Sequence, residues 1–193
     1  MDDTTIGKLV AGVDEAGRGP LAGSVVAAAV ILGETGLMAG LTDSKKLSAI
    51  KRGQFENQIK QNAIAWAIGE ASCREIDEIN ILQASMLAMK RALLKLNPQP
   101  DHALIDGNRV PDIPGLHMRA IIKGDLYEPS ISAASILAKE HRDRQMLELD
   151  QLYPQYRFAK HKGYPTKLHC SLLKQYGASP VHRFSFRPVR ELI

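Results

Sequence analysis

Hydrophobic runs near the start of the chain predict strands rather than helices. Two short runs rich in Val and Ala, at 9–14 and 24–32, flank a turn that contains Gly17 and Gly19. Short apolar runs on either side of a glycine turn are typical of a hairpin of two largely buried strands. A third run of this kind, at 63–69, predicts another strand.

Helical periodicity fills much of the remaining chain. Helices are expected at 47–61, at about 81–96, at 130–149 and at about 166–175. The first of them has Ser48 as its cap. Upstream of the second, Ser72-Cys-Arg-Glu75 has the spacing of a capping box, in which two side chains bind each other's backbone amides.

Two further strands are expected in the second half of the chain. The run 102–106 finishes on Asp106, and the run 116–125 finishes on Asp125. Three strands therefore come first and two come later, and the later strands are joined through helices. This order predicts an α/β fold class, with a mixed sheet flanked by helices.

Composition supports a single domain over residues 1–193. A hydrophobic content of 45% is enough for a core. No window approaches the roughly 20 apolar residues of a membrane-spanning helix, and the first residues lack the pattern of a secretion signal, so we expect a cytoplasmic protein. Cys73 and Cys170 have no metal-site spacing and are predicted to be reduced thiols.

The net charge of +4 is unevenly distributed. Residues 151–190 hold eight of the Lys and Arg residues, no Asp or Glu, and seven of the ten aromatic residues. Interleaved cations and rings are typical of a nucleic-acid surface, and we interpret 151–193 as a basic, aromatic-rich substrate-binding extension. For any single residue in it, a solvated charge or a small aromatic core is the simpler explanation.

Acidic residues stand at the ends of three predicted strands: Asp14 with Glu15, then Asp106, then Asp125. Strand ends at one edge of a sheet converge, so these carboxylates are expected to share a pocket. Clustered acids repel one another unless a cation neutralises them. Two divalent ions can activate a water and hold a scissile phosphate, which makes a phosphodiester the predicted substrate.

The neighbouring acids raise a geometric problem. Successive side chains of a strand point to opposite faces, so Asp14 and Glu15 reach one pocket only if the strand stops or bulges between them. We expect Asp14 to be the shared, bridging ligand. Glu15 is left with three options: a second metal position, a water, or its main-chain carbonyl.

The turn Gly17-Arg18-Gly19 is suited to binding a sugar-phosphate through main-chain amides, because glycine lets the backbone approach closely. Competing motifs do not fit. The turn lacks the Lys and Ser or Thr of a phosphate-binding P-loop, and it misses the dinucleotide-binding spacing by one residue. The six histidines form no HExxH pattern, so a histidine-based zinc site is not expected.

Several segments together resemble ribonuclease HII, the bacterial type 2 ribonuclease H, nearly from end to end. They are Gly12-Val-Asp-Glu-Ala-Gly-Arg-Gly-Pro-Leu-Ala-Gly23, Asp43-Ser-Lys-Lys-Leu47, Asn80-Ile-Leu-Gln-Ala-Ser85, Asp106-Gly107, Lys123-Gly-Asp125, Ile131-Ser-Ala-Ala-Ser-Ile-Leu-Ala-Lys139 and His161-Lys-Gly-Tyr164. The resemblance implies the ribonuclease H-like fold. It also implies an endonuclease that cuts the RNA strand of RNA-DNA hybrids and cuts 5′ of ribonucleotides embedded in duplex DNA, leaving 3′-hydroxyl and 5′-phosphate ends.

The resemblance also implies roles for individual residues. The metal-binding and catalytic acids are Asp14, Glu15, Asp106 and Asp125, acting with two Mn²⁺ or Mg²⁺ ions. The turn Gly17, Arg18 and Gly19 reads the 2′-hydroxyl of the ribonucleotide, and the ring of Tyr164 stacks on the next deoxyribose. Lys45 and Lys46 contact phosphates. The 2′-hydroxyl is the group that separates ribose from deoxyribose, so a close backbone turn suits that task.

Three classes of protein compete on this sequence: a hybrid-specific nuclease, a related nuclease or transposase of the same fold, and a non-catalytic nucleic-acid binder. A DNA-only enzyme has no use for a reader of the 2′-hydroxyl. Four retained acids argue against the binder, because uncompensated carboxylates oppose the approach of a polyanion. No dimerisation surface is evident, so a monomer is expected.

Overall fold

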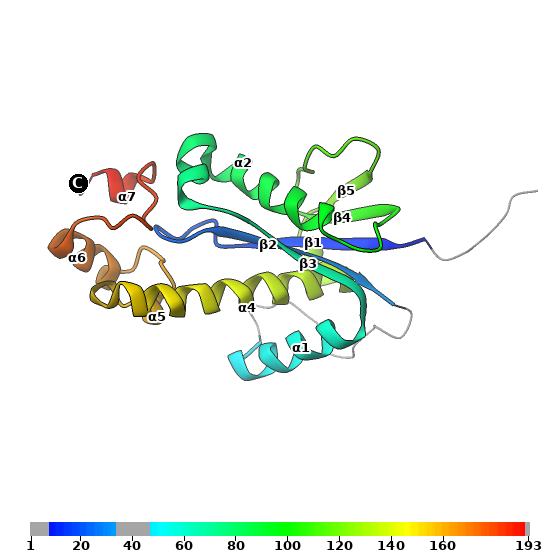
Figure 1. Ribbon diagram of the computed structural model, residues 1–193, viewed down its shortest axis with the longest axis horizontal. Helices are drawn as coiled ribbons and strands as arrows, with labels where there is room; N and C mark the ends of the chain where they lie inside the picture. Colours follow the sequence, from blue (N-terminus) through cyan, green and yellow to red (C-terminus); the bar gives the residue numbers. More distant parts are fainter. Residues whose placement is uncertain (1–7, 34–46, 192–193) are drawn as a thin grey trace, which may run out of the picture.

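A five-stranded mixed sheet forms the centre of the computed structural model, which describes residues 8–33 and 47–191 (Figure 1). Its strands are β1 (Val10–Ala16), β2 (Val25–Leu32), β3 (Ala63–Ala71), β4 (His102–Asp106) and β5 (His117–Ile121). Their order is β3-β2-β1-β4-β5. The β1–β2 and β2–β3 pairs are antiparallel, whereas β1–β4 and β4–β5 are parallel. The predicted mixed sheet is therefore confirmed.

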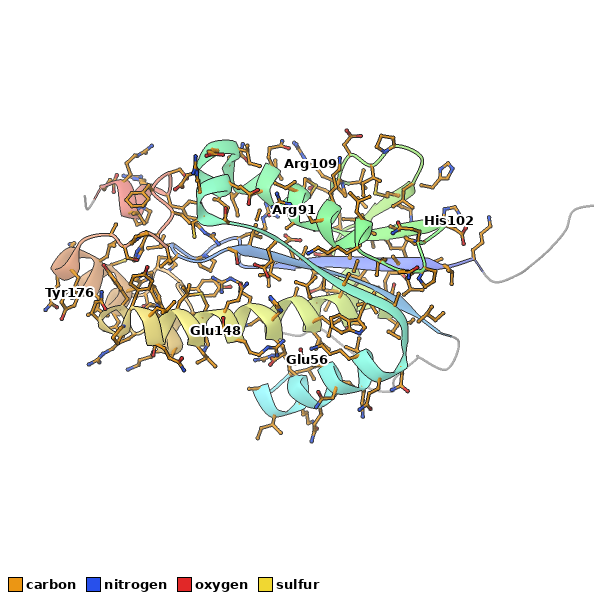
Figure 2. The ribbon with its side chains drawn as sticks, viewed as in Figure 1. Glu56, Arg91, His102, Arg109, Glu148 and Tyr176 are labelled. Atoms are coloured by element: carbon orange, nitrogen blue, oxygen red, sulfur yellow. The ribbon has the colours of Figure 1, made fainter. Side chains whose placement is uncertain are left out.

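Helices cover both faces of the sheet. They are α1 (Ala49–Asn62), α2 (Cys73–Leu94), α3 (Gly124–Tyr127), α4 (Pro129–Leu152), the short 3₁₀ helix η3 (Pro154–Tyr156), α5 (Phe158–His161), α6 (Lys167–Tyr176) and α7 (Arg187–Arg190). Helix α2 lies on one face, and α4 with α1 lies on the other (Figure 1). The helices from α5 onward gather at one end of the molecule. Tyr176 lies at that end, opposite His102 (Figure 2).

Strand β2 explains why both faces need cover. Its residues are almost all buried, so it carries a continuous apolar run rather than an alternation of polar and apolar residues. Val25, Ala27 and Ile31 belong to the core on the α2 side, whereas Val26 and Val30 belong to the core on the α4 side. Both layers bury apolar area against the sheet, which is the main source of stability in such a fold.

Helix α4 lies unusually close to β1. A Cβ atom on Gly12 would lie 2.1 Å from the carbonyl carbon of Ser130, so only glycine fits where the strand crosses the start of the helix. The neighbouring helix residues Ala133 and Ala134 are small and fully buried. This approach brings the middle of α4 beside the end of β1, where Asp14 lies.

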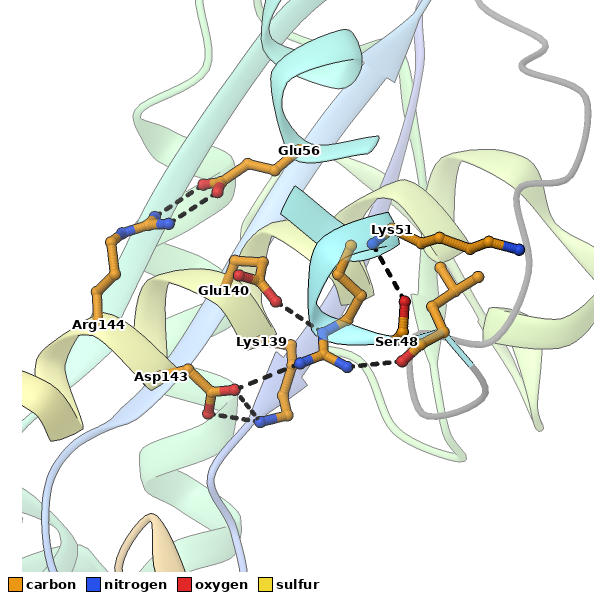
Figure 3. A network of polar contacts seen from close by, with 9 residues as sticks. Ser48, Lys51, Glu56, Lys139, Glu140, Asp143 and Arg144 are labelled. Atoms are coloured by element: carbon orange, nitrogen blue, oxygen red, sulfur yellow. Dashed lines mark hydrogen bonds and ion pairs between the residues drawn. The ribbon is translucent and has the colours of Figure 1, made fainter. Parts of the chain in front are cut away.

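An ion-pair network attaches α1 to α4 (Figure 3). Glu56 of α1 is buried and accepts two hydrogen bonds of 2.7 Å from the guanidinium of Arg144. Arg52 donates to Glu140 at 2.6 Å and lies 3.7 Å from Asp143. Bidentate and networked pairs hold geometry better than isolated surface pairs. The network therefore fixes the position of α1 against α4.

The structure corrects three expected boundaries. Helix α2 begins directly after the Ser72 capping box, earlier than expected. The expected start near 81 is a break within it, where Asn80 has a φ of 66° and its Oδ1 accepts hydrogen bonds from the amides of Leu82 and Gln83. Strand β1 runs through Ala16, beyond the expected end at 14. The expected strand 116–125 ends at Ile121, because Lys123 adopts a left-handed conformation and starts α3. Asp125 therefore lies on a short helix and not on a strand end.

Several local predictions are confirmed. Ser48 caps α1, and the capping box of Ser72 and Glu75 is formed in both directions. The structure adds two features of the helix starts: Pro129 occupies the first turn of α4, and the side chain of Thr166 caps α6. Within the described residues, no helix is long and apolar enough to cross a membrane.

Candidate active site

A pocket of about 290 Å³ opens beside the end of β1. Three parts of the chain line it: the segment from β1 into the following turn, the middle of α4, and Tyr164. The lining residues are Asp14, Glu15, Ala16, Gly17, Arg18, Gly19, Ser135, Lys139, Arg142 and Tyr164. The turn and Tyr164, which are about 145 positions apart in sequence, are therefore brought to one place as predicted.

Asp14 is the most buried of the acids, with 5% of its surface exposed. Its Oδ1 accepts a hydrogen bond of 2.7 Å from the backbone amide of Glu15. Burial raises the pKa of Asp14 well above its ordinary value, and the charges of Glu15 and Asp106 raise it further. A carboxylate in this position is stabilised by a nearby cation.

Glu15 divides its two oxygens between different environments. Oε1 accepts a hydrogen bond of 3.2 Å from Arg18 in the following turn. Oε2 is buried and has no hydrogen-bond partner among the described residues. Burial raises the pKa of Glu15, and the Arg18 guanidinium acts in the opposite direction. A buried anionic oxygen without a donor is unfavourable unless something else binds it.

The expected stop or bulge between Asp14 and Glu15 is wrong. The β1–β2 pairing continues without a shift through Glu15↔Ala27 and Ala16↔Val26. The pairing of β1 with β4, in contrast, ends at Val13↔Ile105. Beyond Val13 the strand therefore projects past its parallel neighbour, and the long Glu15 side chain turns toward Arg18 at this open corner.

Asp106 and Asp125 complete the acidic group from the neighbouring elements. Asp106 is the last residue of β4, and its Oδ1 accepts a hydrogen bond of 3.4 Å from the backbone amide of Asp125. The Asp106 charge raises the pKa of both Asp14 and Glu15. Asp106 is therefore close to Asp14 and Glu15, whereas Asp125 is connected to the group through its backbone amide and arrives through α3. Neither Asp106 nor Asp125 is among the residues that line the pocket.

The acids lie near one another, but their side chains are not arranged as a complete set of metal ligands. Within 8–33 and 47–191, no three His, Cys, Asp or Glu side chains are arranged as a ready-made metal site. The chemistry of the group still fits a divalent ion, because carboxylate oxygens are the ligands that Mg²⁺ and Mn²⁺ prefer. Two features support a cation site here: Oε2 of Glu15 has no hydrogen-bond partner within the described part of the chain, and the pKa values of Asp14 and Glu15 are raised. A bound cation would stabilise the charged form of both carboxylates.

The Gly17-Arg18-Gly19 turn is packed as tightly as the sequence suggests. Gly17 has a φ of +98°, and a Cβ atom there would lie 2.1 Å from Nε of Arg142. At Gly19 a Cβ atom would lie 3.5 Å from the ring of Tyr164. The turn and this ring are therefore adjacent, and Tyr164 is 45% exposed, so it is accessible to a ligand in the pocket.

Three histidines behind Tyr164 were not expected from the sequence to act together. The amide of Ser179 donates to Nδ1 of His182, so Nε2 of His182 carries the proton and donates to Nε2 of His169 at 3.1 Å. Nδ1 of His169 then donates to the carbonyl of Tyr164 at 3.0 Å. His161 stacks on His169 with ring centroids 4.3 Å apart. This chain of neutral imidazoles holds the backbone of Tyr164 in place.

The histidine chain predicts acid sensitivity. Burial lowers the pKa of both His169 and His182 to about 4, whereas in the unfolded chain both titrate near 6.5. The unfolded state therefore binds more protons between pH 6.5 and pH 4, so stability is lost as pH falls through this window. We expect the thermal unfolding midpoint to fall by several degrees from pH 7 to pH 5. The double variant His169→Gln, His182→Gln should show a flatter profile, and an equally steep one would contradict this assignment.

The basic extension is less uniform than its composition suggested. Arg183 is completely buried, and Tyr156 and Phe158 belong to a core cluster, so these three residues are unavailable to a nucleic acid. The surface is formed by the remaining exposed cations and rings. They are Arg157, Lys160, Lys167, Lys174, Arg187 and Arg190 among the cations, and Tyr164, Tyr176 and Phe184 among the aromatics.

Two predicted contacts and three unpredicted ones remain. Lys45 and Lys46 lie outside the described residues. Ser135, Lys139 and Arg142 line the pocket but were not singled out from the sequence. The first two lie within a segment that carried the family resemblance, which is a signal that could have found them. For Arg142 no comparable signal is present.

Comparison with known proteins gives consistent matches. Residues 11–189 match the family model described as Ribonuclease HII. A protein named Ribonuclease HII from Vibrio campbellii (strain ATCC BAA-1116) is 57% identical over 186 residues, which are 96% of this chain and 87% of that protein. The relative of the same name from Vibrio parahaemolyticus serotype O3:K6 is 56% identical over 96% of this chain and 88% of its own length.

Solved structures match over nearly the whole chain as well. The crystal structure of ribonuclease H2 from Pyrococcus horikoshii OT3 aligns with a TM-score of 0.79 and 28% identity, covering 95% of this chain and 96% of that one. The RNase HII in the structure of a PCNA:RNase HII complex from Archaeoglobus fulgidus aligns with a TM-score of 0.78 and 26% identity, covering 93% and 95%.

Proposed function

Because the chain belongs to the ribonuclease HII family, we propose that the acidic pocket beside β1 is its active site and that the residues lining it carry out the family reaction. The protein is an endonuclease that acts on the RNA of RNA-DNA hybrids and on ribonucleotides in DNA. Its fold is ribonuclease H-like. The roles of the individual residues in this reaction are proposed below.

The assignment depends on one observation: the same pocket contains acidic side chains and a glycine turn beside an aromatic ring. Asp14 and Glu15 supply buried oxygen ligands, while Gly17 and Gly19 supply a backbone surface next to Tyr164. The first pair suits chemistry at a phosphodiester, and the second group suits recognition of the sugar beside it. A pocket that only bound nucleic acid would gain nothing from the acids.

Ribonucleases H require divalent metal ions, and in this chain we assign their ligands to Asp14, Glu15, Asp106 and Asp125. When bound, two Mn²⁺ or Mg²⁺ ions would supply an activated water and a counter-charge for the leaving oxygen. The role of the protein is to orient these carboxylates for metal binding. The amide of Glu15 donates to Asp14 at 2.7 Å and orients its carboxylate, and the amide of Asp125 makes a longer contact of 3.4 Å with Asp106. Glu15 offers its unpartnered Oε2.

Substrate recognition is assigned to the turn and the ring. The turn of Gly17, Arg18 and Gly19 lets a ribose approach close enough for main-chain atoms to bind its 2′-hydroxyl, and Tyr164 stacks on the next deoxyribose. In line with the family resemblance, we propose cleavage on the 5′ side of the ribonucleotide, with 3′-hydroxyl and 5′-phosphate products. Lys45 and Lys46 are proposed phosphate contacts, and the exposed cations of 151–193 extend the surface along the duplex.

The partners are therefore RNA-DNA hybrids and ribonucleotide-containing duplex DNA. We propose that the protein acts as a monomer within a single domain, with 151–193 as its binding extension. We also propose that it acts in the cytoplasm.

The function is tested by one cleavage assay. A labelled DNA duplex with a single ribonucleotide is incubated with the protein, with and without Mn²⁺ or Mg²⁺, beside an all-DNA duplex of the same sequence. We expect one cut, 5′ of the ribonucleotide, only when a divalent ion is present. Cleavage of the all-DNA duplex at a similar rate, or cleavage in a chelator, would refute the assignment.

A further inference from the structure

Two buried arginines lie beneath the Gly17-Arg18-Gly19 turn. Arg183 has no exposed surface, and Arg142 is 2% exposed. Arg183 comes from the C-terminal segment and Arg142 from α4, so distant parts of the chain place both side chains under the same few residues. Full burial is rare for arginine and calls for a complete account of its hydrogen bonds.

Arg183 donates to four carbonyl oxygens, all of them within 17–24. Nη2 binds the carbonyl of Gly17 at 2.6 Å and that of Ser24 at 3.1 Å. Nη1 binds the carbonyl of Arg18 at 3.0 Å, and Nε binds that of Gly23 at 2.9 Å. The planar guanidinium of Arg183, with its fixed donor directions, therefore binds the turn on the side that faces the protein interior.

Arg142 connects this turn to the segment that carries Tyr164. Its Nη2 donates to the carbonyl of Ala22 at 3.2 Å, and its Nη1 donates to the carbonyl of Lys162 at 3.1 Å. The backbone joins the same two segments, because the amide of Leu21 donates to the carbonyl of Gly163 at 2.7 Å. Arg142 also fills the space that a side chain on Gly17 would need.

Peptide geometry gives these contacts a consequence. In a planar trans peptide the C=O of one residue points opposite to the N–H of the next. The carbonyls of Gly17 and Arg18 point inward to Arg183. The amides of Arg18 and Gly19 therefore point the other way, toward the pocket. These are the groups that a ribose hydroxyl or a phosphate oxygen would meet.

The arrangement is not what stability alone would favour. Burial, together with the nearby charge of Arg142, lowers the pKa of Arg183 to about 9. No ion pair joins either arginine to a carboxylate among the described residues. Buried charges of one sign without a counter-ion are destabilising, and apolar residues of similar volume are often better tolerated. Their presence here is explained if they serve the turn.

We propose that Arg183 is the positioning residue of the Gly17-Arg18-Gly19 turn and that Arg142 ties the turn to the Tyr164 segment, so that together they set the discrimination between ribose and deoxyribose. The proposal rests on the proposed role of the turn. Arg183 touches neither substrate nor metal in this account. It holds the carbonyls inward, and the outward amides make the contact.

The test substitutes Arg183→Lys, which keeps the charge but cannot reach four separated carbonyls. Affinity is measured in Ca²⁺ for a duplex with one ribonucleotide and for the all-DNA duplex, together with Mn²⁺ affinity by calorimetry and the unfolding midpoint. We expect the ratio of the two duplex affinities to fall about tenfold or more, with Mn²⁺ affinity unchanged. Arg119→Lys, on an exposed side chain of the edge strand β5, is the matched control and should leave the ratio unchanged.

Two results would overturn the proposal. One is a wild-type affinity ratio in Arg183→Lys, and the other is a loss of Mn²⁺ affinity in parallel with the ratio, which would indicate general disruption. If Arg183→Lys does not fold, Arg142→Lys is judged by the same readouts. Failure of the proposed function is seen separately, because it would appear in the wild-type protein as equal affinity for the two duplexes.

Discussion

Asp14→Asn is expected to lower the cleavage rate at the single ribonucleotide by on the order of 10³-fold or more, because it removes the charge of the proposed bridging ligand. Asparagine has nearly the same shape, and its side-chain oxygen can still accept the hydrogen bond from the amide of Glu15. Affinity for the duplex should therefore change little. Single-turnover rates in Mn²⁺ and fluorescence anisotropy separate these two effects.

The same variant has a second readout with the opposite sign. The folded pKa of Asp14 is raised, so its ionised form is less favourable in the metal-free fold than in the unfolded chain. This penalty is present at neutral pH and disappears as pH falls to the unfolded pKa. The metal-free Asp14→Asn protein should consequently unfold at the same or a higher temperature than wild type at pH 7.

Asp112→Asn is the matched control, since Asp112 is exposed in the segment between β4 and β5. It should leave rate, affinity and stability unchanged. Near-normal turnover in Asp14→Asn would remove Asp14 from the reaction. A large loss of duplex affinity would instead mean that the acids bind substrate directly.

Gly17→Ala is expected to weaken duplex binding by more than tenfold while leaving Mn²⁺ binding at the acids intact. Two physical effects combine at this position. The φ of +98° is unfavourable for any residue with a Cβ, at about 1–2 kcal/mol. In addition the new methyl group would lie 2.1 Å from Nε and 2.5 Å from Cδ of Arg142, so the turn or the arginine must move.

Gly115→Ala separates the two effects. Gly115 also has a positive φ, of +83°, but a Cβ atom there meets nothing within 4 Å. It should reduce the unfolding midpoint modestly and leave duplex affinity unchanged. If Gly17→Ala behaved like Gly115→Ala, with a loss of stability and normal binding, the turn would have no special part in recognition.

The active-site assignment and the positioning proposal make different demands on the molecule. Asp14 acts through charge, so its removal affects the chemical step. Gly17 and Arg183 act through shape, so their substitution affects the choice of substrate. A set of variants that divides along this line, with rate effects from the acids and discrimination effects from the turn, would support both assignments together.

Local features of the sequence were sufficient for most of the fold. All five strands were located from the sequence. In β2 the signal is a continuous apolar run, because this strand is buried on both faces. In β5, which has no buried residue, it is a short segment before a carboxylate. Ser48, Ser72 and Thr166 were recognisable or expected helix starts, because a cap is formed by residues three positions apart. The expected helix start near 81 is a real break within α2. Asn80 has a non-helical φ of 66° and ψ of 164°, and its Oδ1 accepts hydrogen bonds from the amides of Leu82 and Gln83, as a helix cap does. What the sequence did not indicate is that a helical stretch precedes it, from Cys73 onward.

The chemistry of the site was also visible in the residue types, but its assembly was not. Asp14, Glu15 and the glycines could be singled out because carboxylates and glycine have few reasons to occur in such a pattern. That Asp125 reaches the group from a short helix depends on the left-handed turn at Lys123. That Arg183 belongs under the turn depends on contacts across 166 positions of sequence.

By itself, then, the sequence determined the strands, the helix caps, the identity of the acids and the presence of a close-approach turn, because each of these depends on a residue and its near neighbours. Only the tertiary structure decided that Arg183, Tyr156 and Phe158 are buried rather than part of the basic surface, and that His169 and His182 support Tyr164. Burial and the partner of a buried polar group are properties of distant segments brought together, and no local pattern contains them.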